Sequence, residues 1–181
     1  MRRGRQARDA NEGQDLPQPP RSNQQSHRGN VATWPFNLSD HIASRRMSSI
    51  RKETFINASS QTVWDALRDV GALHTRLVPG FVTDTRLEPG ARIVTFGNGQ
   101  VIRELIVDLN EQDRRLVWAV VDGPFRHYNA SAQVLEAGPA SCHFVWIADL
   151  LPNELANDVA TMMEQGLSVI KQTMEGSTVR T

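Results

Sequence analysis

Hydrophobic and polar positions alternate in short runs between residues 50 and 150, and glycine or proline separates most runs from the next. A period of two is typical of β-strands that are buried on one face. The pattern predicts seven strands: IRKETFIN, FVTDTRLE, ARIVTF, QVIRELIVDL, RLVWAVVDG, FRHYNASAQVLEA and SCHFVWIADL. Short turns such as Pro89-Gly90 and Gly97-Asn98-Gly99 join consecutive strands. Since such turns connect antiparallel neighbours, we expect one antiparallel sheet.

Helical spacing replaces this alternation in two regions. QTVWDALRDV follows serines suited to an N-cap and has apolar residues at helical spacing, and ALHTRLV is expected to add a second short helix. The segment NELANDVATMMEQGLSVIKQTMEG predicts a helix of about six turns. Its apolar stripe consists of Leu155, Val159, Met162, Met163, Gly166 and Ile170. The concave face of a curved sheet is the surface available to cover this stripe.

The strand VIRELIVDL has a carboxylate at its centre. Alternation places Glu104 with Ile102 and Ile106 on one face, and four aliphatic residues with Arg103 on the other. The pattern alone favours burial of the more aliphatic face, which leaves Glu104 solvated. A buried Glu104 would need a hydrogen-bond partner, and desolvation would raise its pKa. Both orientations stay open on the sequence alone.

Two strands and the long helix supply candidate wall residues for a ligand site. Tyr128 and Ala130 share an alternating apolar face, where small alanines make room for a ligand or for a bulky neighbour. Tyrosine also offers a hydroxyl that can orient a ligand. Trp146 lies on the apolar face of SCHFVWIADL, which is either core or pocket wall. Met162 and Met163 are either core residues or adaptable contacts for apolar ligands.

Charge is distributed unevenly along this chain of zero net charge. Residues 1–46 have eight arginines and four acidic residues, whereas residues 47–181 have twelve basic and sixteen acidic residues. The second part has no basic stripe, so we expect no nucleic-acid partner for it. The first part is rich in Arg, Gln, Asn, Pro and Ser and poor in aliphatic residues, which predicts disorder.

These patterns divide the chain into a disordered tail (1–46), a folded domain (48–176) and a short C-terminal tail (177–181). Met47 begins MSSIRKETFINAS, which looks like a protein start running into the first strand. One hypothesis is that translation begins at Met47 and that residues 1–46 are an over-extended reading frame. The other is a translated basic tail that touches RNA or an acidic surface.

Other kinds of chemistry find no support in the sequence. Cys142 is the one cysteine, and the five histidines have no metal-ligand spacing. No nucleophile elbow or phosphate-binding loop occurs. We therefore expect no metal, no cofactor and no nucleophilic catalysis. No segment approaches the roughly 18–20 apolar residues of a membrane span, and no secretion signal is evident, so we expect a cytoplasmic protein.

The order of the predicted elements resembles the helix-grip fold of the SRPBCC, or START-like, superfamily. The resemblance covers about residues 48–176 and rests on INASSQTVWDAL, the GNG turn, VIREL followed by NEQDRRLVWAV, and GPFRHYNASAQV. This superfamily includes polyketide cyclases and dehydrases, lipid-transfer domains, the birch-pollen allergen and plant abscisic acid receptors. The resemblance implies an α+β fold with seven antiparallel strands curved around a long C-terminal helix and two short helices after the first strand. It also implies a cavity between sheet and helix.

Two residues match pocket positions of the abscisic acid receptors. Glu104 in RELIVDLNEQDRR falls on a pocket glutamate of those receptors, and Tyr128 in RHYNAS falls on a pocket tyrosine. The chain has Gly97-Asn98-Gly99 where the receptors have a Ser-Gly-Leu-Pro-Ala gate loop, and their pocket lysine has no evident counterpart. These differences argue against hormone-receptor function.

The predicted function is non-covalent binding of a small hydrophobic or amphipathic molecule in an internal cavity. The candidate ligand-binding residues are Glu104, Tyr128, Ala130, Trp146, Met162 and Met163. One alternative is a polyketide cyclase or dehydratase-like enzyme, in which Glu104 or Tyr128 moves protons. Another is a co-chaperone-like interaction module, whose interior would be filled. The residues identify neither the ligand nor the oligomeric state.

Overall fold

Seven strands form a single antiparallel sheet within residues 46–178, the part of the chain that the computed structural model describes. The strands are β1 (Ser48–Ile56), β2 (Val82–Glu88), β3 (Ala91–Phe96), β4 (Val101–Asn110), β5 (Arg115–Val120), β6 (His127–Gly138) and β7 (Ser141–Leu151). Strands β2 to β7 follow one another as a meander, and β1 pairs with β7. The predicted antiparallel sheet is confirmed.

Helical segments flank this sheet in the order that the sequence predicts. Helix α2 (Ser60–Leu67) begins where the Ser59 side chain accepts a hydrogen bond from the backbone N–H of Thr62. The second short helix is a single π-helical turn, η2 (Leu73–Leu77). A 3-10 turn, η3 (Asn153–Leu155), leads into the long helix α3 (Ala156–Thr178). No helix among these described segments is long and apolar enough to cross a membrane.

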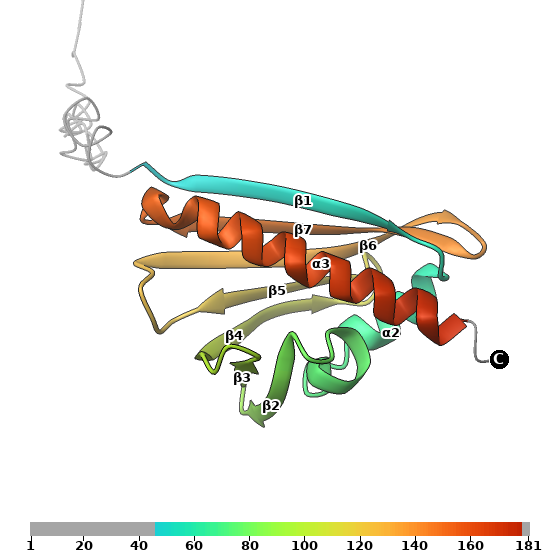
Figure 1. The fold of residues 1–181 in the computed structure, drawn as a ribbon, viewed down its shortest axis with the longest axis horizontal. Coiled ribbons are helices and arrows are strands. Elements are labelled where there is room, and N and C mark those ends of the chain that lie inside the picture. Colours follow the sequence, from blue (N-terminus) through green and yellow to red (C-terminus); the bar gives the residue numbers. More distant parts are fainter. Residues whose placement is uncertain (1–45, 179–181) are drawn as a thin grey trace, which may run out of the picture. The chain divides into compact units, whose positions relative to one another are not determined.

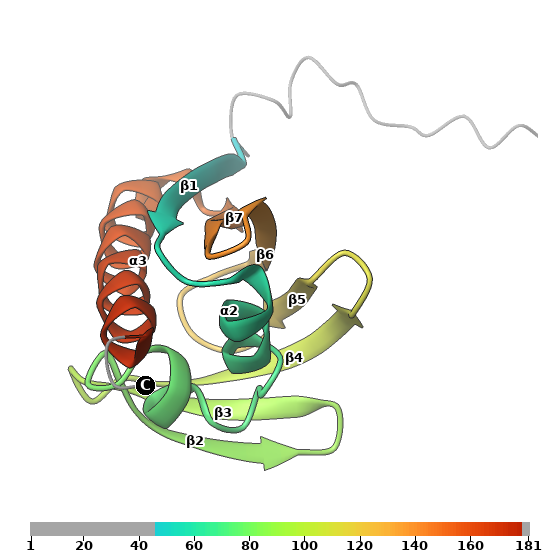
Figure 2. The ribbon, with the colours of Figure 1, turned by 90° about the vertical axis from the view of Figure 1, so that its right-hand side faces the viewer.

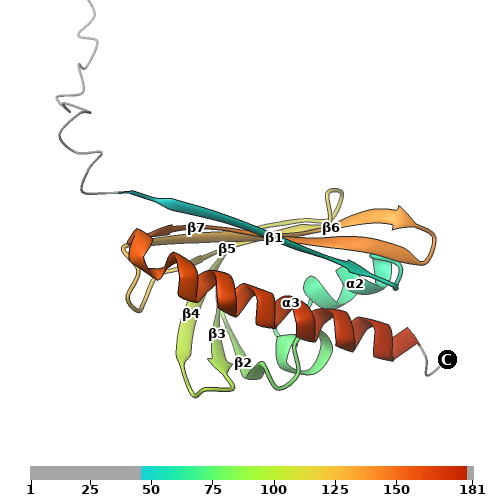
Figure 3. The same ribbon diagram turned by 45° about the horizontal axis from the view of Figure 1, so that its top comes forward.

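The sheet curls strongly around the helical segments. Figure 2 shows α2 inside the curl, and it shows α3 along the open side. Figure 1 and Figure 3 show α3 running lengthwise beside β1, and α3 also contacts η2, which lies near the opposite edge of the sheet. Because a curved sheet presents its concave face inward, the side chains of that face meet the helical stripe. The expected helix-grip arrangement is confirmed.

The core lies between the concave face of the sheet and the helices. Its largest fully buried side chains are Trp64, Phe144, Ile56, Leu116, Leu150, Met163 and Ile170. The alternating faces predicted in β6 and β7 are both turned inward, since Tyr128, Ala130, Cys142 and Phe144 are all buried. Period-two patterning therefore identifies the core face of these two strands correctly.

Strand β4 departs from simple alternation. Its more aliphatic face points outward, with Val101 60% and Val107 57% exposed, whereas Glu104 is only 7% exposed. The expectation from the pattern that this aliphatic face is buried is wrong. An irregularity between Ile106 and Asp108 leaves Val107 unpaired with β5, so that Ile106 and Leu109 both pack on the core. A bulge of this kind shifts the alternation by one residue.

The predicted tails fall mostly outside the described residues. Residues 1–45 and 179–181 are not described, so the predicted disorder of the N-terminal segment stays a prediction. At the other end, the backbone of α3 extends through Thr178, two residues beyond the predicted end of the domain.

A glycine in α3 allows the helix to approach the sheet closely. A Cβ atom on Gly166 would lie 2.9 Å from Cζ3 of Trp146 and 3.4 Å from Cε1 of Phe81. Carbon atoms in ordinary contact lie about 3.5–4.0 Å apart. Glycine in a helix interior lowers stability by about 0.5–1 kcal/mol relative to alanine. The tight contact with Trp146 explains why position 166 has glycine despite this cost.

We expect Gly166→Ala to lower the free energy of unfolding by about 1–3 kcal/mol, because the added methyl group overpacks against Trp146. Gly176→Ala is the matched control on the same helix, since nothing lies within 4 Å of a Cβ atom there. This control should raise the free energy of unfolding by up to about 1 kcal/mol through helix propensity. Urea unfolding followed by circular dichroism measures both. A stabilised Gly166→Ala variant would contradict the close contact.

The C-terminal half of α3 is fixed to the end of β1 by a small polar cluster. Oε1 of Glu175 accepts hydrogen bonds from the backbone N–H and side-chain amide of Asn57, each at 2.9 Å, and from Nζ of Lys171 at 2.7 Å. Lys171 also donates to the backbone carbonyl of Phe55. These bonds, led by that from Lys171, lower the pKa of Glu175.

Because this pKa is lower in the folded than in the unfolded state, the contribution of Glu175 to stability is present at neutral pH and is lost as pH falls through the folded-state pKa. Glu175→Gln should therefore lower the melting temperature at about pH 7, and the difference from wild type should narrow towards about pH 3. Thermal unfolding at several pH values tests this. Asp84→Asn is the control, since Asp84 is exposed and has no ion pair within the described chain. An equal narrowing for Asp84→Asn would show a general charge effect.

Candidate functional site

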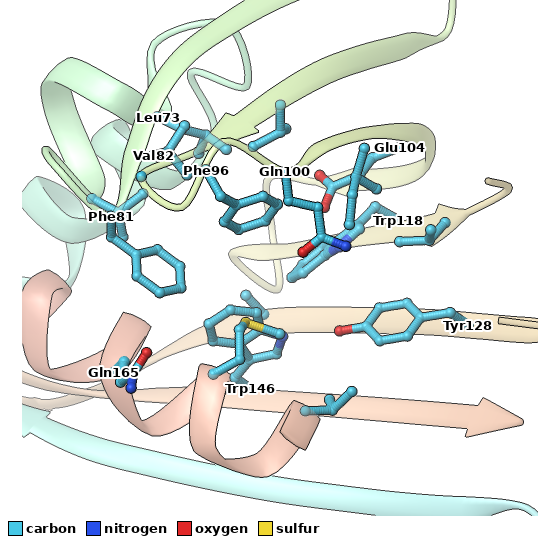
Figure 4. A pocket seen from close by; sticks show the side chains of 18 of the residues that line it. Leu73, Phe81, Val82, Phe96, Gln100, Glu104, Trp118, Tyr128, Trp146 and Gln165 are labelled. Atoms are coloured by element: carbon cyan, nitrogen blue, oxygen red, sulfur yellow. The ribbon is translucent and has the colours of Figure 1, made fainter. Parts of the chain in front are cut away.

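A cavity of about 620 Å³ lies between the concave face of the sheet, η2 and α3 (Figure 4). Its aromatic wall comprises Phe81, Phe96, Trp118, Phe125, Tyr128, Phe144 and Trp146. Aliphatic residues from η2, β3, β4 and α3 complete most of the remaining surface. Pockets for small organic molecules occupy about 300–1,000 Å³ and are mainly apolar, so this cavity has the size and character of a ligand site.

A buried ion pair forms the polar part of the wall. Arg92 in β3 and Glu104 in β4 are directly opposite each other in the antiparallel register. Nε of Arg92 donates a hydrogen bond of 2.6 Å to Oε2 of Glu104, and the two side chains are 4% and 9% exposed. The guanidinium carbon lies 5.6 Å from the centroid of the Trp118 ring, which is within cation–π distance. Both charges are therefore compensated within the wall.

Two hydrogen-bond donors of the wall have no protein partner. Within residues 46–178, Nη1 of Arg92 and Nε1 of Trp146 are both buried without an acceptor. A buried donor that lacks an acceptor costs about 1–3 kcal/mol. Both residues line the cavity, so its wall contains two N–H donors that the described part of the protein leaves unpaired.

Tyr128 supplies a hydroxyl group from β6. Burial, and secondarily the negative charge of Glu104, raise the pKa of Tyr128 above its ordinary value. The phenol therefore stays protonated and is able to donate a hydrogen bond. In Figure 4 the hydroxyl end of Tyr128 points into the cavity, and the ring centroids of Tyr128 and Phe125 lie 4.8 Å apart.

The rim of the cavity is more polar than its interior. Asn98 and Gln100 of the β3–β4 turn, together with Asp158 and Gln165 of α3, line the cavity and are exposed. The turn is held against the preceding loop, because the N–H of Gly97 donates to the carbonyl of Phe81 at 2.9 Å. A Cβ atom at Gly97 would lie 2.6 Å from the carbonyl oxygen of Gly80, so only glycine fits this contact.

The structure brings four of the six predicted site residues to the cavity. These are Glu104, Tyr128, Trp146 and Met162. The other two do not line it. Ala130 is packed within the sheet between Trp118 and Ala148, and Met163 is fully buried in the core.

Arg92 and Trp118 line the cavity but were not among the predicted site residues. A signal for Arg92 exists in the sequence. Arg92 shares the inward face of ARIVTF with Val94 and Phe96, and Arg92 and Glu104 lie equally far from Asn98 at the centre of the turn. Pairing the strands across that turn would have placed these charges together. Among the described residues, no group of three or more His, Cys, Asp or Glu side chains is arranged to hold a metal ion.

The curled sheet, the long helix and the internal cavity define a helix-grip protein. Residues 47–175 match the family described as "Polyketide cyclase / dehydrase and lipid transport", and the chain belongs to this family. The resemblance inferred from the sequence is thereby confirmed. No curated protein sequence matches the chain.

Solved structures of the same fold are distant in sequence. An uncharacterized protein from Bacillus thuringiensis is 18% identical, with a TM-score of 0.64 over 70% of this chain and 98% of that one. Norcoclaurine synthase from Thalictrum flavum is 18% identical, with a TM-score of 0.59 over 75% and 98%. The di-domain ARO/CYC BexL from the BE-7585A biosynthetic pathway is 16% identical, with a TM-score of 0.64 over 72% and 47%. At such identities the similarity establishes the fold alone.

We expect Arg92→Met to lower the free energy of unfolding by about 3–5 kcal/mol, because it leaves the Glu104 carboxylate buried without its partner. The double variant Arg92→Met/Glu104→Leu removes both charges and should lie within about 1 kcal/mol of wild type or above it. Denaturant unfolding of the wild type, of Arg92→Met, of Glu104→Leu and of the double variant gives the coupling energy between the two residues. Losses that simply add in the double variant would mean that the two charges do not compensate each other.

Proposed function

We propose that this domain binds a small, mostly apolar molecule in the cavity, with the polar end of the molecule beside Arg92, Glu104 and Tyr128. The observation that carries the proposal is a buried ion pair in the wall of a cavity of about 620 Å³. A sheet that served only as scaffold would gain more from apolar packing at this place, since a buried ion pair seldom adds stability over apolar residues.

The wall suits recognition of an apolar body with one polar end. Burial of apolar surface contributes about 25 cal/mol per Å² to binding, but it does not fix the orientation of the ligand. A few polar groups at fixed positions then orient the ligand. Arg92 and Glu104 lie on the neighbouring strands β3 and β4, and Tyr128 lies on β6 of the same sheet, so regular secondary structure holds all three. Lipids are one class of molecule with this character, and lipid binding stays a prediction, as does the cytoplasmic location.

A polyketide cyclase or dehydratase-like activity is the second candidate. It is supported by the family to which the chain belongs and by the placement of Glu104 and Tyr128 on one cavity. Such an enzyme acts largely by holding a flexible substrate in a reactive conformation. Turnover of a bound molecule, followed by mass spectrometry of the released products, distinguishes this candidate from simple binding.

The third hypothesis, a co-chaperone-like interaction module, predicted a filled interior. A cavity of about 620 Å³ that is lined by aromatic residues counts against it.

Native mass spectrometry of the full chain, purified from its own host, tests the proposal. We expect a non-covalent adduct of a few hundred daltons that is lost on denaturation, as the size of the cavity allows. Ala132→Leu places a larger side chain on the cavity wall and should reduce the adduct at least about fivefold, because it fills part of the space.

Ala130→Leu is the matched control on the same strand, since Ala130 is buried but does not line the cavity. Ala130→Leu should lower the free energy of unfolding by about 1–3 kcal/mol through overpacking. The molecules that are folded should still carry the adduct. A chain that carries no adduct and binds no apolar probe would refute the proposed function. Equal loss of the adduct in both variants would place the ligand elsewhere.

A further inference from the structure

We propose that the cavity selects electrically neutral molecules whose buried end carries a hydrogen-bond acceptor, such as a ketone or ester carbonyl, and that it rejects carboxylates. This inference rests on the proposed binding function and adds the chemical class of the ligand. It follows from two features of the wall, the balance of its charges and the donors that have no partner.

The charges of the interior cancel. Of the described residues that line the cavity, Arg92, Glu104 and Asp158 carry a formal charge. Arg92 and Glu104 neutralise each other inside, and Asp158 lies exposed at the rim. A carboxylate that entered would therefore lose its hydration without meeting a free cation, and it would compete with Glu104 for the same guanidinium. An ammonium group would likewise find a carboxylate that is already paired.

The interior also contains unpaired N–H donors. Within residues 46–178, Nη1 of Arg92 and Nε1 of Trp146 have no acceptor, and the Tyr128 phenol adds a further O–H. A neutral carbonyl oxygen accepts hydrogen bonds through two lone pairs and brings no charge. A purely apolar molecule would leave these donors unpaired. A neutral acceptor thus fits both features of the wall.

A change at Glu104 should shift this preference from neutral ligands towards carboxylates. Glu104→Gln removes the negative charge but keeps a side-chain oxygen that is able to accept from Nε of Arg92. The interior then has one uncompensated cation. A carboxylate ligand would form a charge-assisted pair with it, whereas a ketone would gain little.

The test uses two probes of the same shape, 2-undecanone and decanoate, in which a methyl group replaces a carboxylate oxygen. Isothermal titration calorimetry of the full chain at about pH 7.5, where a carboxylic acid is ionised, measures both affinities. We expect wild type to prefer 2-undecanone by at least about tenfold. In Glu104→Gln the affinity for decanoate should rise at least about tenfold, and the ratio of the two affinities should shift towards decanoate by a similar factor.

Two further variants act as controls. Glu154→Gln makes the same chemical change at an exposed residue that does not line the cavity, and the preference should stay that of wild type. Arg92→Met/Glu104→Leu keeps the interior neutral but removes the Arg92 donors. This double variant should weaken the binding of 2-undecanone at least about fivefold without strengthening the binding of decanoate. It provides the test if Glu104→Gln does not fold.

The outcomes distinguish the selectivity of the cavity from its function as a binding site. Equal or tighter binding of decanoate to wild type, or a preference unchanged in Glu104→Gln, would overturn the selectivity and leave the cavity as a binding site. A shift in Glu154→Gln as large as that in Glu104→Gln would also overturn it, since overall charge would then explain the effect. Failure of both probes to bind wild type, together with the absence of an adduct in native mass spectrometry, would refute the proposed function itself.

Discussion

The ion pair between Arg92 and Glu104 is the interaction on which the organisation of the interior depends. Two charges of this kind are tolerated inside an apolar cavity only while they face each other, because either one alone would carry the full cost of its desolvation. A slip of one residue between β3 and β4 would move one charge to the other face of the sheet. The pair therefore favours the observed register of this hairpin, and it places two opposite charges in the interior of the cavity.

The space in front of this pair results from where the chain places small and large side chains. Ala132 leaves room on the concave face of β6, and Gly166 lets α3 lie directly against the ring of Trp146. The large aromatic rings then stand as walls around the cavity. Because aromatic side chains have few rotatable bonds, walls of this type keep their shape at little cost in conformational entropy.

Most of the fold follows from the hydrophobic periodicity of each segment and from the glycine and proline residues that separate the segments. Alternation identified the inward faces of β6 and β7, and the N-cap at Ser59 and the stripe of α3 are as predicted. Alternation failed in β4, where the bulge near Val107 shifts the period and where a charged partner, rather than hydrophobicity, selects the buried face. The pattern of one strand does not contain Arg92, so the orientation of Glu104 becomes readable only when two strands are paired. Likewise, helical spacing places Met162 and Met163 on one stripe, but their different distances from the cavity are set by tertiary packing.

The protonation of Tyr128 bears on the choice between binding and catalysis. Proton transfer is most effective when the pKa of the donor lies near the working pH. Burial and the charge of Glu104 move the pKa of Tyr128 upward, away from that range, so the phenol is a weaker acid than a free tyrosine. The same shift keeps its hydrogen available as a hydrogen-bond donor. This environment suits a residue that orients a bound molecule, and any reaction in the cavity would depend on the position of the substrate more than on acid catalysis by Tyr128.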